Sequence, residues 1–402
     1  MNYLFLSESF YPHYGGAELA TYLYAKRLAG KGNKIVVLTN RFPNEPEVSR
    51  SKNIVIYRLN LLKNNDSKYS VFFRFDTLIS SFLRRLVKWS DIVYIPRLWL
   101  NAIPYVKKLG KPVMVHLHDY FPICPLSTIF EFEKKSTCSS PYCKPSCVWL
   151  TERYQNRTQS NAFLSSVLNP TLGSWIGGLV NFADSIICVS NAQKEILVRR
   201  LPNLQKKIHV IYNPMPDVSD IALEGNDFGY FGGNNQFKGI SVLCESLKII
   251  KKQGQYNPII YATKMLTQNY SYNSYLGKLG VVAYDKLGLT EFEQMYSSIQ
   301  TVIVPSIWPE PLPYVVAEAL IRGRLLIASK IGGIPELLNG CRGVIEVEPS
   351  NTIQLADAIS KIMNIDDEEK MRMGRQNRET FLRRFNDEAN LNRFISLAES
   401  LI

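Results

Sequence analysis

Residues 302–320 read VIVPSIWPEPLPYVVAEAL, and this stretch decides the fold class. The apolar run at its start predicts a buried strand, the prolines that follow predict a turn, and the apolar spacing after Pro313 predicts a helix. Proline suits the start of a helix because it lacks an amide hydrogen. A buried strand followed by a turn and a helix is typical of a parallel α/β sheet, which binds ligands at the carboxyl ends of its strands.

Apolar strands alternate with helical segments on both sides of this stretch. We predict strands at Tyr3–Leu6, Lys34–Thr39, Asn53–Leu59, Ile92–Ile95, Val113–Leu117, Ser185–Val189, Ile208–Tyr212, Phe228–Phe231, Ile259–Tyr261, Val281–Val282, Val302–Val304 and Leu325–Ile327. A chain of 402 residues is too long for one growing core. We therefore predict two Rossmann-like α/β domains, residues 1–203 and 204–380, divided where Pro202 and Asn203 interrupt the pattern, and an amphipathic helix over 381–402.

Composition and charge limit the classes of partner. With 46% apolar and 20% charged residues the chain is globular, and its net charge of +12 favours anionic partners: nucleotide phosphates, a polyanion or an anionic membrane surface. The basic residues are dispersed, so no nucleic-acid partner is expected. No apolar run reaches the ~18 residues of a membrane-spanning helix, and residues 1–8 lack the basic start of a secretory signal. We expect a cytoplasmic protein.

Two glutamates stand around the predicted helix start. Glu310 precedes it and Glu318 lies inside it, and eight residues at ~100° each return to within ~80° of the same side. A helix N-terminus binds phosphate, and carboxylates accept hydrogen bonds from paired hydroxyls. A nucleotide sugar, with polyol parts on either side of a diphosphate, would use both. The alternative is one capping and one solvated glutamate on a surface helix.

The first predicted domain offers a second set of candidates. Gly15 and Gly16 follow the first strand and open a helix, which lets the backbone approach a phosphate or leaving group; a simple tight turn is the alternative. His118 and Asp119 follow the strand at 113–117, at the carboxyl end where a ligand should bind. His116 has the same side-chain direction as His118, and a buried core histidine is its more typical role.

Several motifs in order along nearly the whole chain resemble one family. They are Gly15-Gly16-Ala17-Glu18, the segment from Gly229 to Lys238-Gly239, the spacing Glu310-x7-Glu318 after Pro305-Ser306, and Gly332-Gly333-Ile334-Pro335-Glu336. Together they resemble the retaining glycosyltransferases of family 4. That resemblance implies the GT-B architecture, in which two Rossmann-like domains face each other across a cleft, and a last helix that crosses back onto the first domain.

The resemblance also implies roles for the candidates of the second domain. Glu310 would contact the transferring sugar and Glu318 the nucleotide ribose. The backbone amides around Leu312 and Tyr314, together with Lys238, would hold the diphosphate. An ordinary surface lysine is the alternative for Lys238.

For the first domain, the resemblance implies a donor-side loop at Gly15 and Gly16. His118 would touch the transferring sugar, and Asp119 would orient His118 or face the acceptor. Transfer would proceed with retention and without a catalytic divalent metal, in keeping with the lack of an Asp-x-Asp motif.

The sequence departs from the family pattern in two places. The loop after Gly233 lacks the arginine that many members use as a second phosphate cation, and the strand at 259–264 lacks the usual Gly-x-Gly after it. Our hypothesis is that Lys264 supplies the missing charge.

Four cysteines fall within one short segment, an insertion at about 121–150. Cys124, Cys138, Cys143 and Cys147 suggest a structural Zn²⁺ site that clamps a long loop, although the spacing is not that of a common zinc finger. Disulfides and free thiols are the alternatives.

The leading hypothesis is a hexose-type glycosyltransferase with a nucleotide-sugar donor and a glycan, lipid-linked or polysaccharide acceptor. A sugar-nucleotide 2-epimerase of the same architecture and a non-catalytic polyanion- or membrane-binding protein are the alternatives. The basic segment 81–89, SFLRRLVKW, fits peripheral docking to an anionic bilayer that carries a lipid-linked acceptor, with a solvated helix face as the other interpretation.

Overall fold

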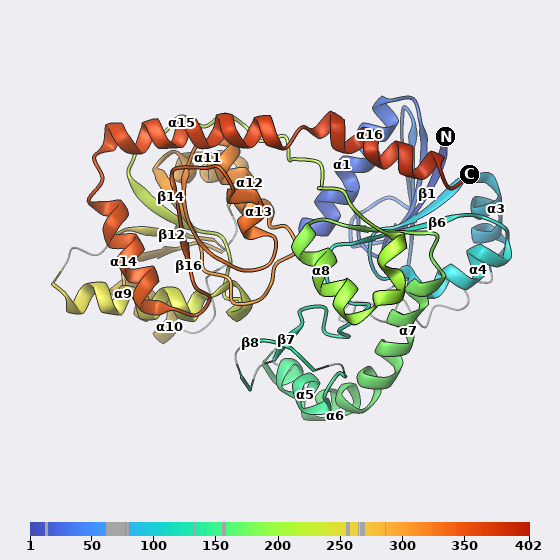
Figure 1. Ribbon diagram of the computed structural model, residues 1–402, viewed down its shortest axis with the longest axis horizontal. Coiled ribbons are helices and arrows are strands. Elements are labelled where there is room, and N and C mark those ends of the chain that lie inside the picture. Colours follow the sequence, from blue (N-terminus) through green and yellow to red (C-terminus); the bar gives the residue numbers. More distant parts are fainter. Residues whose placement is uncertain are drawn as a thin grey trace. The chain divides into compact units, whose positions relative to one another are not determined.

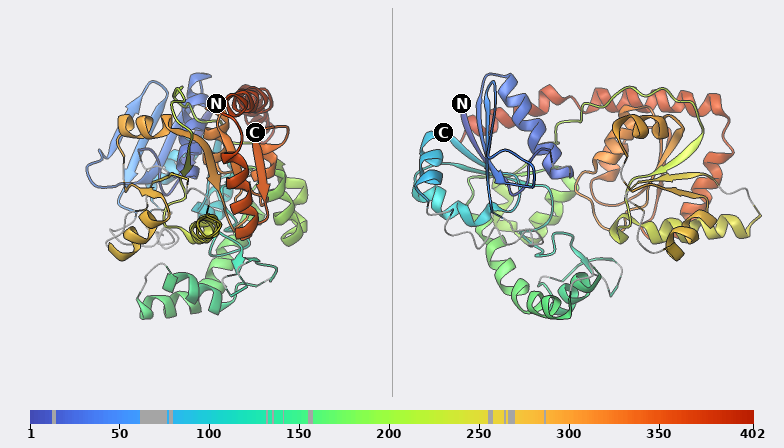
Figure 2. Two further views of the ribbon diagram at one scale, coloured as in Figure 1. Left: turned by 90° about the vertical axis from the view of Figure 1, so that its left-hand side faces the viewer. Right: turned by 180° about the vertical axis from the view of Figure 1, so that it is seen from behind.

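The computed structural model divides into two compact units (Figure 1). The first unit comprises Met1–Pro214 with Asp387–Ile402, and the second comprises Met215–Asn386. The structure describes every residue except 13–14, 62–76, 78–79, 132, 135, 141, 155–157, 255–257, 264, 266–269 and 286. Each unit is a twisted, mostly parallel sheet with helices on both faces (Figure 2). The predicted α/β class with Rossmann-like halves is confirmed.

The sheet of the first unit has eight strands in the order β10-β9-β6-β5-β1-β2-β4-β3. They are β1 (Asn2–Leu6), β2 (Lys34–Asn40), β3 (Val48–Ser51), β4 (Ile54–Leu59), β5 (Ile92–Ile95), β6 (Val113–Leu117), β9 (Ser185–Cys188) and β10 (Ile208–Val210). All neighbours are parallel except β3, which runs antiparallel to β4 at the edge. The chain reverses its direction of travel across the sheet between β1 and β5, and such a switch point is where α/β sheets bind ligands.

Helices of the first unit cover both sheet faces. They are α1 (Gly16–Gly30), α3 (Ser81–Trp89), η2 (Trp99–Ala102), α4 (Ile103–Lys108), α8 (Asn191–Arg200), η5 (Pro202–Lys207) and α16 (Asp387–Glu399). An insertion between β6 and β9 carries the hairpin β7–β8 and a helical arm, which we define as residues 159–182, from α6 to η4. It contains β7 (Phe130–Glu131), β8 (Ser136–Thr137), α5 (Pro145–Tyr154), α6 (Gln159–Leu168), η3 (Asn169–Gly173), α7 (Ser174–Gly178) and η4 (Leu179–Phe182).

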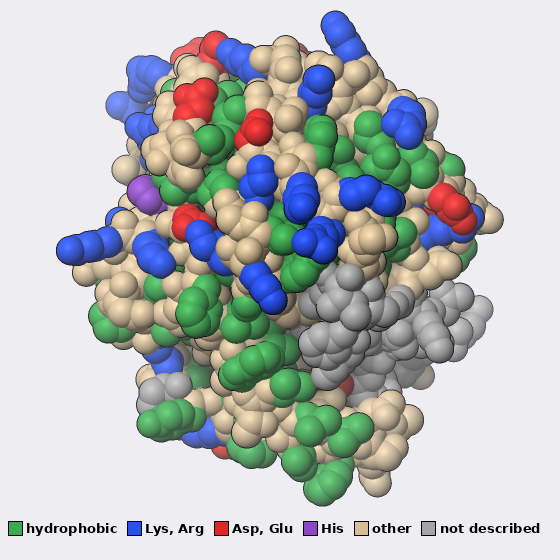
Figure 3. Space-filling model, turned by 90° about the vertical axis from the view of Figure 1, so that its right-hand side faces the viewer, with side chains coloured by type: hydrophobic (Ala, Val, Ile, Leu, Met, Phe, Trp, Pro, Cys, Tyr) green, Lys and Arg blue, Asp and Glu red, His purple; other side chains and the backbone are tan. Residues whose placement is uncertain are grey.

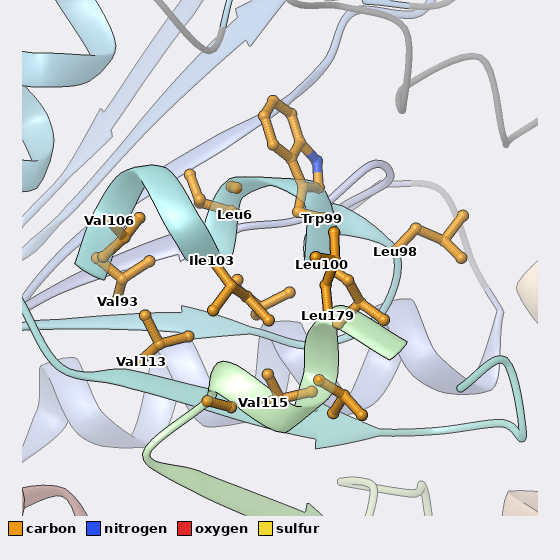
Figure 4. Packing of buried hydrophobic residues seen from close by; sticks show 14 of the residues in the cluster. Leu6, Val93, Leu98, Trp99, Leu100, Ile103, Val106, Val113, Val115 and Leu179 are labelled. Carbon is orange, nitrogen blue, oxygen red and sulfur yellow. The ribbon is translucent and has the colours of Figure 1, made fainter. Parts of the chain in front are cut away.

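Two apolar cores form because side chains alternate between the faces of a strand. Leu4 and Leu6 of β1 join one core, in which Val115 of β6 and Ile103 of α4 are fully buried (Figure 4). Tyr3 and Phe5 point to the opposite core, beneath α1 and α16. The first sheet is thus buried on both faces, as a parallel sheet requires.

The second unit has a six-stranded parallel sheet in the order β13-β12-β11-β14-β15-β16. Its strands are β11 (Asp227–Tyr230), β12 (Ile260–Ala262), β13 (Val281–Ala283), β14 (Ile299–Val304), β15 (Leu325–Ser329) and β16 (Val344–Val347). Its helices are η6 (Gln236–Lys238), α9 (Ile240–Lys252), α10 (Tyr270–Lys278), α11 (Leu289–Ser297), α12 (Tyr314–Ile321), α13 (Ile334–Leu338), α14 (Thr352–Met363) and α15 (Asp367–Arg384). This is the strand order of a dinucleotide-binding fold, with its switch point between β11 and β14.

The units divide after Pro214 rather than after residue 203. The predicted strand at Ile208–Tyr212 forms as β10, but it pairs in parallel with β9 and therefore completes the first sheet instead of opening the second. The apolar pattern located the strand, but it carried no information about its partner.

The chain returns to the first unit at its end. The segment predicted as one helix over 381–402 is interrupted at Phe385 and Asn386, so α15 ends in the second unit and α16 belongs to the first. Asp387 forms an ion pair with Arg27 of α1, and Phe394 packs against Tyr24 with ring centroids 4.5 Å apart. None of the described helices is both long and apolar enough to cross a membrane.

Candidate functional site

The second unit places its candidate residues on the two loops that flank the switch point. The loop after β11 carries Lys238, and the loop after β14 carries Ser306 and Glu310. The carboxyl ends of neighbouring parallel strands meet at one edge of the sheet, so loops distant in sequence are brought together there. The Ile307 amide donates to the Phe237 carbonyl at 2.9 Å and joins the two loops directly.

Glu310 is buried, with 3% of its surface exposed, and it is held by two partners. The Lys238 ammonium forms an ion pair with Oε2, and the Ser306 hydroxyl donates to Oε1. Lys238 also lies 5.7 Å from the centre of the Trp308 ring. A buried carboxylate is costly unless it is paired in this way, and the two partners hold the Glu310 side chain in a fixed orientation. Lys238 is therefore not an ordinary surface lysine.

Two glycines permit this close packing of backbones. Gly239 has φ of 80°, and a Cβ atom there would lie 1.8 Å from the Pro305 carbonyl oxygen. Gly332 has φ of 58°, and a Cβ atom there would lie 2.3 Å from the Glu310 carbonyl oxygen. Both conformations favour glycine, and both spaces exclude any side chain. The two glycine motifs seen in the sequence thus serve to position Lys238 and Glu310.

Helix α12 begins at Tyr314 as predicted, and Pro313 caps it without a side-chain hydrogen bond. Glu318 is half-buried in this helix. Burial raises the pKa of the nearby Tyr296 phenol to about 12; the Arg322 cation opposes this shift and the Glu318 charge adds to it. Leu312 and Tyr314 lie at the N-terminus of α12, where backbone amides favour an anion.

His118 follows β6 in the first unit. Its Nδ1 lies 3.5 Å from the Asn213 amide nitrogen, and its buried Nε2 has no hydrogen-bond partner among the described residues. Burial lowers the pKa of His118 to about 3, with Asp119 opposing and Arg97 assisting the shift. His118 is thus a neutral imidazole with one nitrogen available to a ligand. His116 is fully buried and bonded to the Tyr94 hydroxyl at 2.7 Å, as expected of a core histidine.

Asp119 is engaged on both carboxylate oxygens. Oδ2 accepts from Arg97 Nε at 2.8 Å, and Oδ1 accepts from the Phe121 amide at 2.9 Å. These contacts fix the turn that carries His118. They favour the role in which Asp119 orients His118 over the role in which Asp119 faces an acceptor.

Comparisons with known proteins identify the family of the chain. The family model for glycosyltransferase family 4 matches residues 14–217, and that for glycosyl transferases group 1 matches residues 225–364. The chain belongs to glycosyltransferase family 4. It is therefore a glycosyltransferase, as the sequence motifs predicted.

Two curated relatives of this glycosyltransferase are each 24% identical to it over the stretch that matches. An uncharacterized 42.6 kDa protein in a cps region of Klebsiella pneumoniae is 24% identical over 92% of this chain and 95% of its own length. Spore coat protein SA of Bacillus subtilis is 24% identical over 48% of this chain and 59% of its own length.

Solved structures share the fold at lower identity. Sucrose-phosphate synthase from Thermosynechococcus elongatus superposes with a TM-score of 0.70 at 16% identity, covering 100% of this chain and 98% of that one. HepE from Anabaena, in complex with UDP and glucose, gives a TM-score of 0.64 at 17% identity, covering 99% of both chains. Both likenesses show the fold alone.

The sequence patterns did not single out Arg97 of this glycosyltransferase. Its guanidinium follows β5 and lies 3.4 Å from Glu8, 3.7 Å from Glu18 and 2.8 Å from Asp119. Burial opposes the charge, but Asp119, Glu8 and Glu18 outweigh it and raise the pKa of Arg97. A position directly after a buried strand is the only signal that could have marked this arginine.

Gly15 and Gly16 stand beside this cluster. Gly15 caps α1, and a Cβ atom there would lie 2.2 Å from a carboxylate oxygen of Glu18. Glu18 therefore folds back over the glycine toward Arg97. Through Glu18 and Arg97, the loop at Gly15 and Gly16 is therefore connected to the end of β5, at the switch point of the first sheet. Lys264, the suggested replacement cation, lies outside the described residues.

The four cysteines of the insertion are half-buried, and none of them forms a disulfide with another described cysteine. Burial raises the pKa of Cys143 to about 12, and the thiols of Cys124, Cys147 and Cys138 add to the shift, which places the four in one region. However, Cys147 Sγ donates to the Phe130 carbonyl at 3.5 Å, and among the described residues no three His, Cys, Asp or Glu side chains are arranged to hold a metal ion. The structure gives no support to the predicted zinc site, which stays a prediction.

Proposed function

We propose that this glycosyltransferase moves a hexose-type sugar from a nucleotide-sugar donor to a glycan, lipid-linked or polysaccharide acceptor, with retention at the anomeric carbon and without a catalytic divalent metal. The observation that carries the proposal is the buried Glu310, held by Lys238 and Ser306 beside the switch point of the second sheet. The fold's relative HepE has been solved with UDP-glucose, which supports a nucleotide sugar as the donor class.

The second unit binds the donor in this proposal. The Lys238 ammonium and the backbone amides around Leu312 and Tyr314, at the N-terminus of α12, stabilise the negative charge that develops on the departing diphosphate. Glu310 contacts the transferring sugar, and Glu318 accepts hydrogen bonds from the ribose hydroxyls. When the sugar binds, Glu310 must give up part of its ion pair with Lys238 and form a hydrogen bond with the sugar instead.

The first unit contributes His118. A neutral imidazole with a buried, unpartnered Nε2 can exchange a hydrogen bond with a sugar hydroxyl without adding charge to the site. Asp119 and Arg97 hold the turn that presents it, and Gly15 with Gly16 provides a backbone surface for close approach to the donor.

A thermal-shift series with nucleoside diphosphates tests the donor site. A ligand at 100 times its dissociation constant stabilises the folded protein by ~2.7 kcal/mol. We expect one base series to raise the melting temperature of the wild type, and Glu318→Ala to abolish the rise. Glu368→Ala, at an exposed position of α15, is the matched control and should respond as the wild type does. A chain that no nucleotide stabilises would contradict the proposal.

A transfer assay tests the role of Glu310. Glu310→Gln keeps the size of the side chain but loses the charge that pairs with Lys238. We expect transfer to fall by at least ~10²-fold, in line with the loss of one electrostatic catalytic group. Full transfer activity in this variant would remove Glu310 from the mechanism. The configuration of the product, read by NMR, tests retention.

A further inference from the structure

A set of large apolar side chains stands in solvent on the helical arm of the insertion. This apolar surface consists of Phe163, Leu164, Val167, Leu168, Trp175 and Phe182. Phe163 is 64% exposed and Trp175 is 63% exposed. Figure 3 shows apolar side chains gathered on the lower part of this face. Exposed apolar patches of this kind mark interaction sites.

Helix α6 inverts the usual pattern of a surface helix. Phe163, Leu164, Val167 and Leu168 recur at the spacing of one helical stripe, and this stripe faces solvent. The buried positions of the same helix are the small residues Ala162 and Ser166. An ordinary surface helix would turn its large apolar residues toward the protein. Here they are directed outward.

The arm is also free of charge. Residues 158–183 contain no Asp, Glu, Lys, Arg or His, although many of them are exposed. Placing this segment in an apolar medium therefore requires no removal of a charged group from water, which is the dominant cost of such a transfer. The composition fits contact with hydrocarbon rather than with water.

Positive charge flanks the apolar surface. The first unit holds 29 lysine and arginine residues against 16 aspartate and glutamate, whereas the second unit holds 18 against 19. The whole excess of positive charge thus lies in the unit that carries the arm. In Figure 3 lysine and arginine side chains lie on the same face above the apolar side chains.

Contacts within the first unit place some of these cations beside the arm. Lys207 donates to the Asn181 and Ala183 carbonyls at 3.0 and 2.9 Å, on either side of Phe182. Lys107 of α4 pairs with Asp184 at 2.6 Å. Helix α3 carries the exposed Arg84 and Arg85; its Leu83 and Val87 are buried, whereas Trp89 is 38% exposed. The segment 81–89 therefore offers mainly charge, whereas the arm offers the larger apolar surface.

We propose that the apolar surface inserts into the interfacial layer of an anionic phospholipid bilayer, while the flanking lysines and arginines contact its headgroups. A polyanion would engage the cations but leave the apolar side chains in water. A second copy of the chain would bring two cationic borders together. The surface contains neither Glu310 nor His118, so this inference extends the membrane contact expected from the sequence without depending on the donor site.

Vesicle flotation with the full chain tests the proposal. The vesicles are phosphatidylcholine alone, or phosphatidylcholine with about 30% phosphatidylglycerol. We expect binding to the anionic vesicles and at least ~10-fold weaker binding by the variant Phe163→Ser/Trp175→Ser. Ile353→Ser, at a 63% exposed position of α14 in the second unit, is the matched control and should bind as the wild type does. Arg84→Gln should weaken binding to anionic vesicles about fivefold.

Three outcomes would overturn the proposal: no binding to anionic vesicles, equal binding by the wild type and the double variant, or a dimer in light scattering that the double variant abolishes. The last outcome would assign the apolar surface to a second copy. The double variant should keep the thermal response to nucleoside diphosphates, which separates a failure of this proposal from a failure of the donor site.

Discussion

At the scale of single residues, Arg97 holds together a charged cluster of the first unit. Its guanidinium lies within 3.7 Å of the carboxylates of Glu8, Glu18 and Asp119, which come from three separate segments of the chain. Removing the cation from such a buried cluster leaves neighbouring like charges without its compensation and costs about 3–5 kcal/mol. We therefore expect Arg97→Ala to lower the free energy of unfolding by this amount in urea titrations.

Arg199→Ala is the control for Arg97→Ala. Arg199 forms an exposed pair with Glu195, its side chain being 77% exposed, and its loss should cost less than about 1 kcal/mol. Equal stability of the two variants would show that Arg97 does not hold the cluster together.

The pKa of His118 predicts a pH dependence of stability. Burial lowers this pKa to about 3 in the folded state, against about 6.5 in an unfolded chain. Between these values the unfolded state binds a proton that the folded state does not, so stability falls as the pH drops from about 6.5 toward about 3, by up to ~1.4 kcal/mol per pH unit. His118→Gln should lose less stability than the wild type between pH 7 and pH 5 in urea titrations. Parallel curves would contradict a neutral, buried His118.

The sequence predicted Glu310, Glu318, Lys238 and His118 because each stands at a fixed position after a buried strand or within a glycine motif. It did not predict Arg97, because the three carboxylates that define its role come from distant points along the chain. An arginine after a strand does not by itself show which carboxylates it will contact. The order of the strands in the sheet determines that, and the sequence pattern did not give this order.

At the scale of elements, the turn at Gly239 positions Lys238 against the end of β14. Gly239→Ala would place a Cβ atom 1.8 Å from the Pro305 carbonyl oxygen, so the two loops must separate. Gly254 has a similar φ of 72°, but a Cβ atom there would meet no atom of the described residues within 4 Å. We expect Gly254→Ala to cost about 1 kcal/mol from backbone conformation alone and Gly239→Ala to cost clearly more, with weakened nucleotide binding. Equal urea midpoints would show that the contact with Pro305 is unimportant.

The four cysteines of the insertion give a second prediction at this scale. Four soft sulfur ligands in one region would release their protons to a metal, and structural zinc sites bind tightly. We expect about one zinc per purified chain by mass spectrometry. Less than ~0.3 zinc per chain would exclude the site and leave four thiols that hold no metal.

Most strands could be predicted because buried parallel strands are continuous apolar runs, as in Ile92–Ile95 and Val113–Leu117. The edge strands Val48–Ser51 and Val344–Val347 were not predicted, because these strands are partly exposed and mix polar with apolar residues. The helices of the arm at 159–182 were not predicted either. Large apolar residues of the arm face solvent, so their spacing did not show which side of each helix is buried.

At the scale of the whole molecule, the two units differ in net charge. The second unit is nearly neutral and carries the residues proposed to hold the donor phosphates, so the net charge of the chain is not explained by the donor. The first unit carries the excess positive charge together with the apolar surface. The composition therefore indicates that the first unit has an anionic partner in addition to the donor.

The return of the chain in α16 makes the first unit depend on the last residues of the sequence. Phe394 is fully buried among Tyr3, Tyr24 and Tyr94, although it lies eight residues from the C-terminus. Phe394→Ala should cost about 3–5 kcal/mol, because it opens a cavity beneath α16. Hydrogen exchange should then rise in β1 and α1 but stay unchanged in β11 and β14, since these strands belong to the other unit. Ile402→Ala, at a 69% exposed terminal residue, should change neither. Equal loss of protection in both units would show that they unfold together.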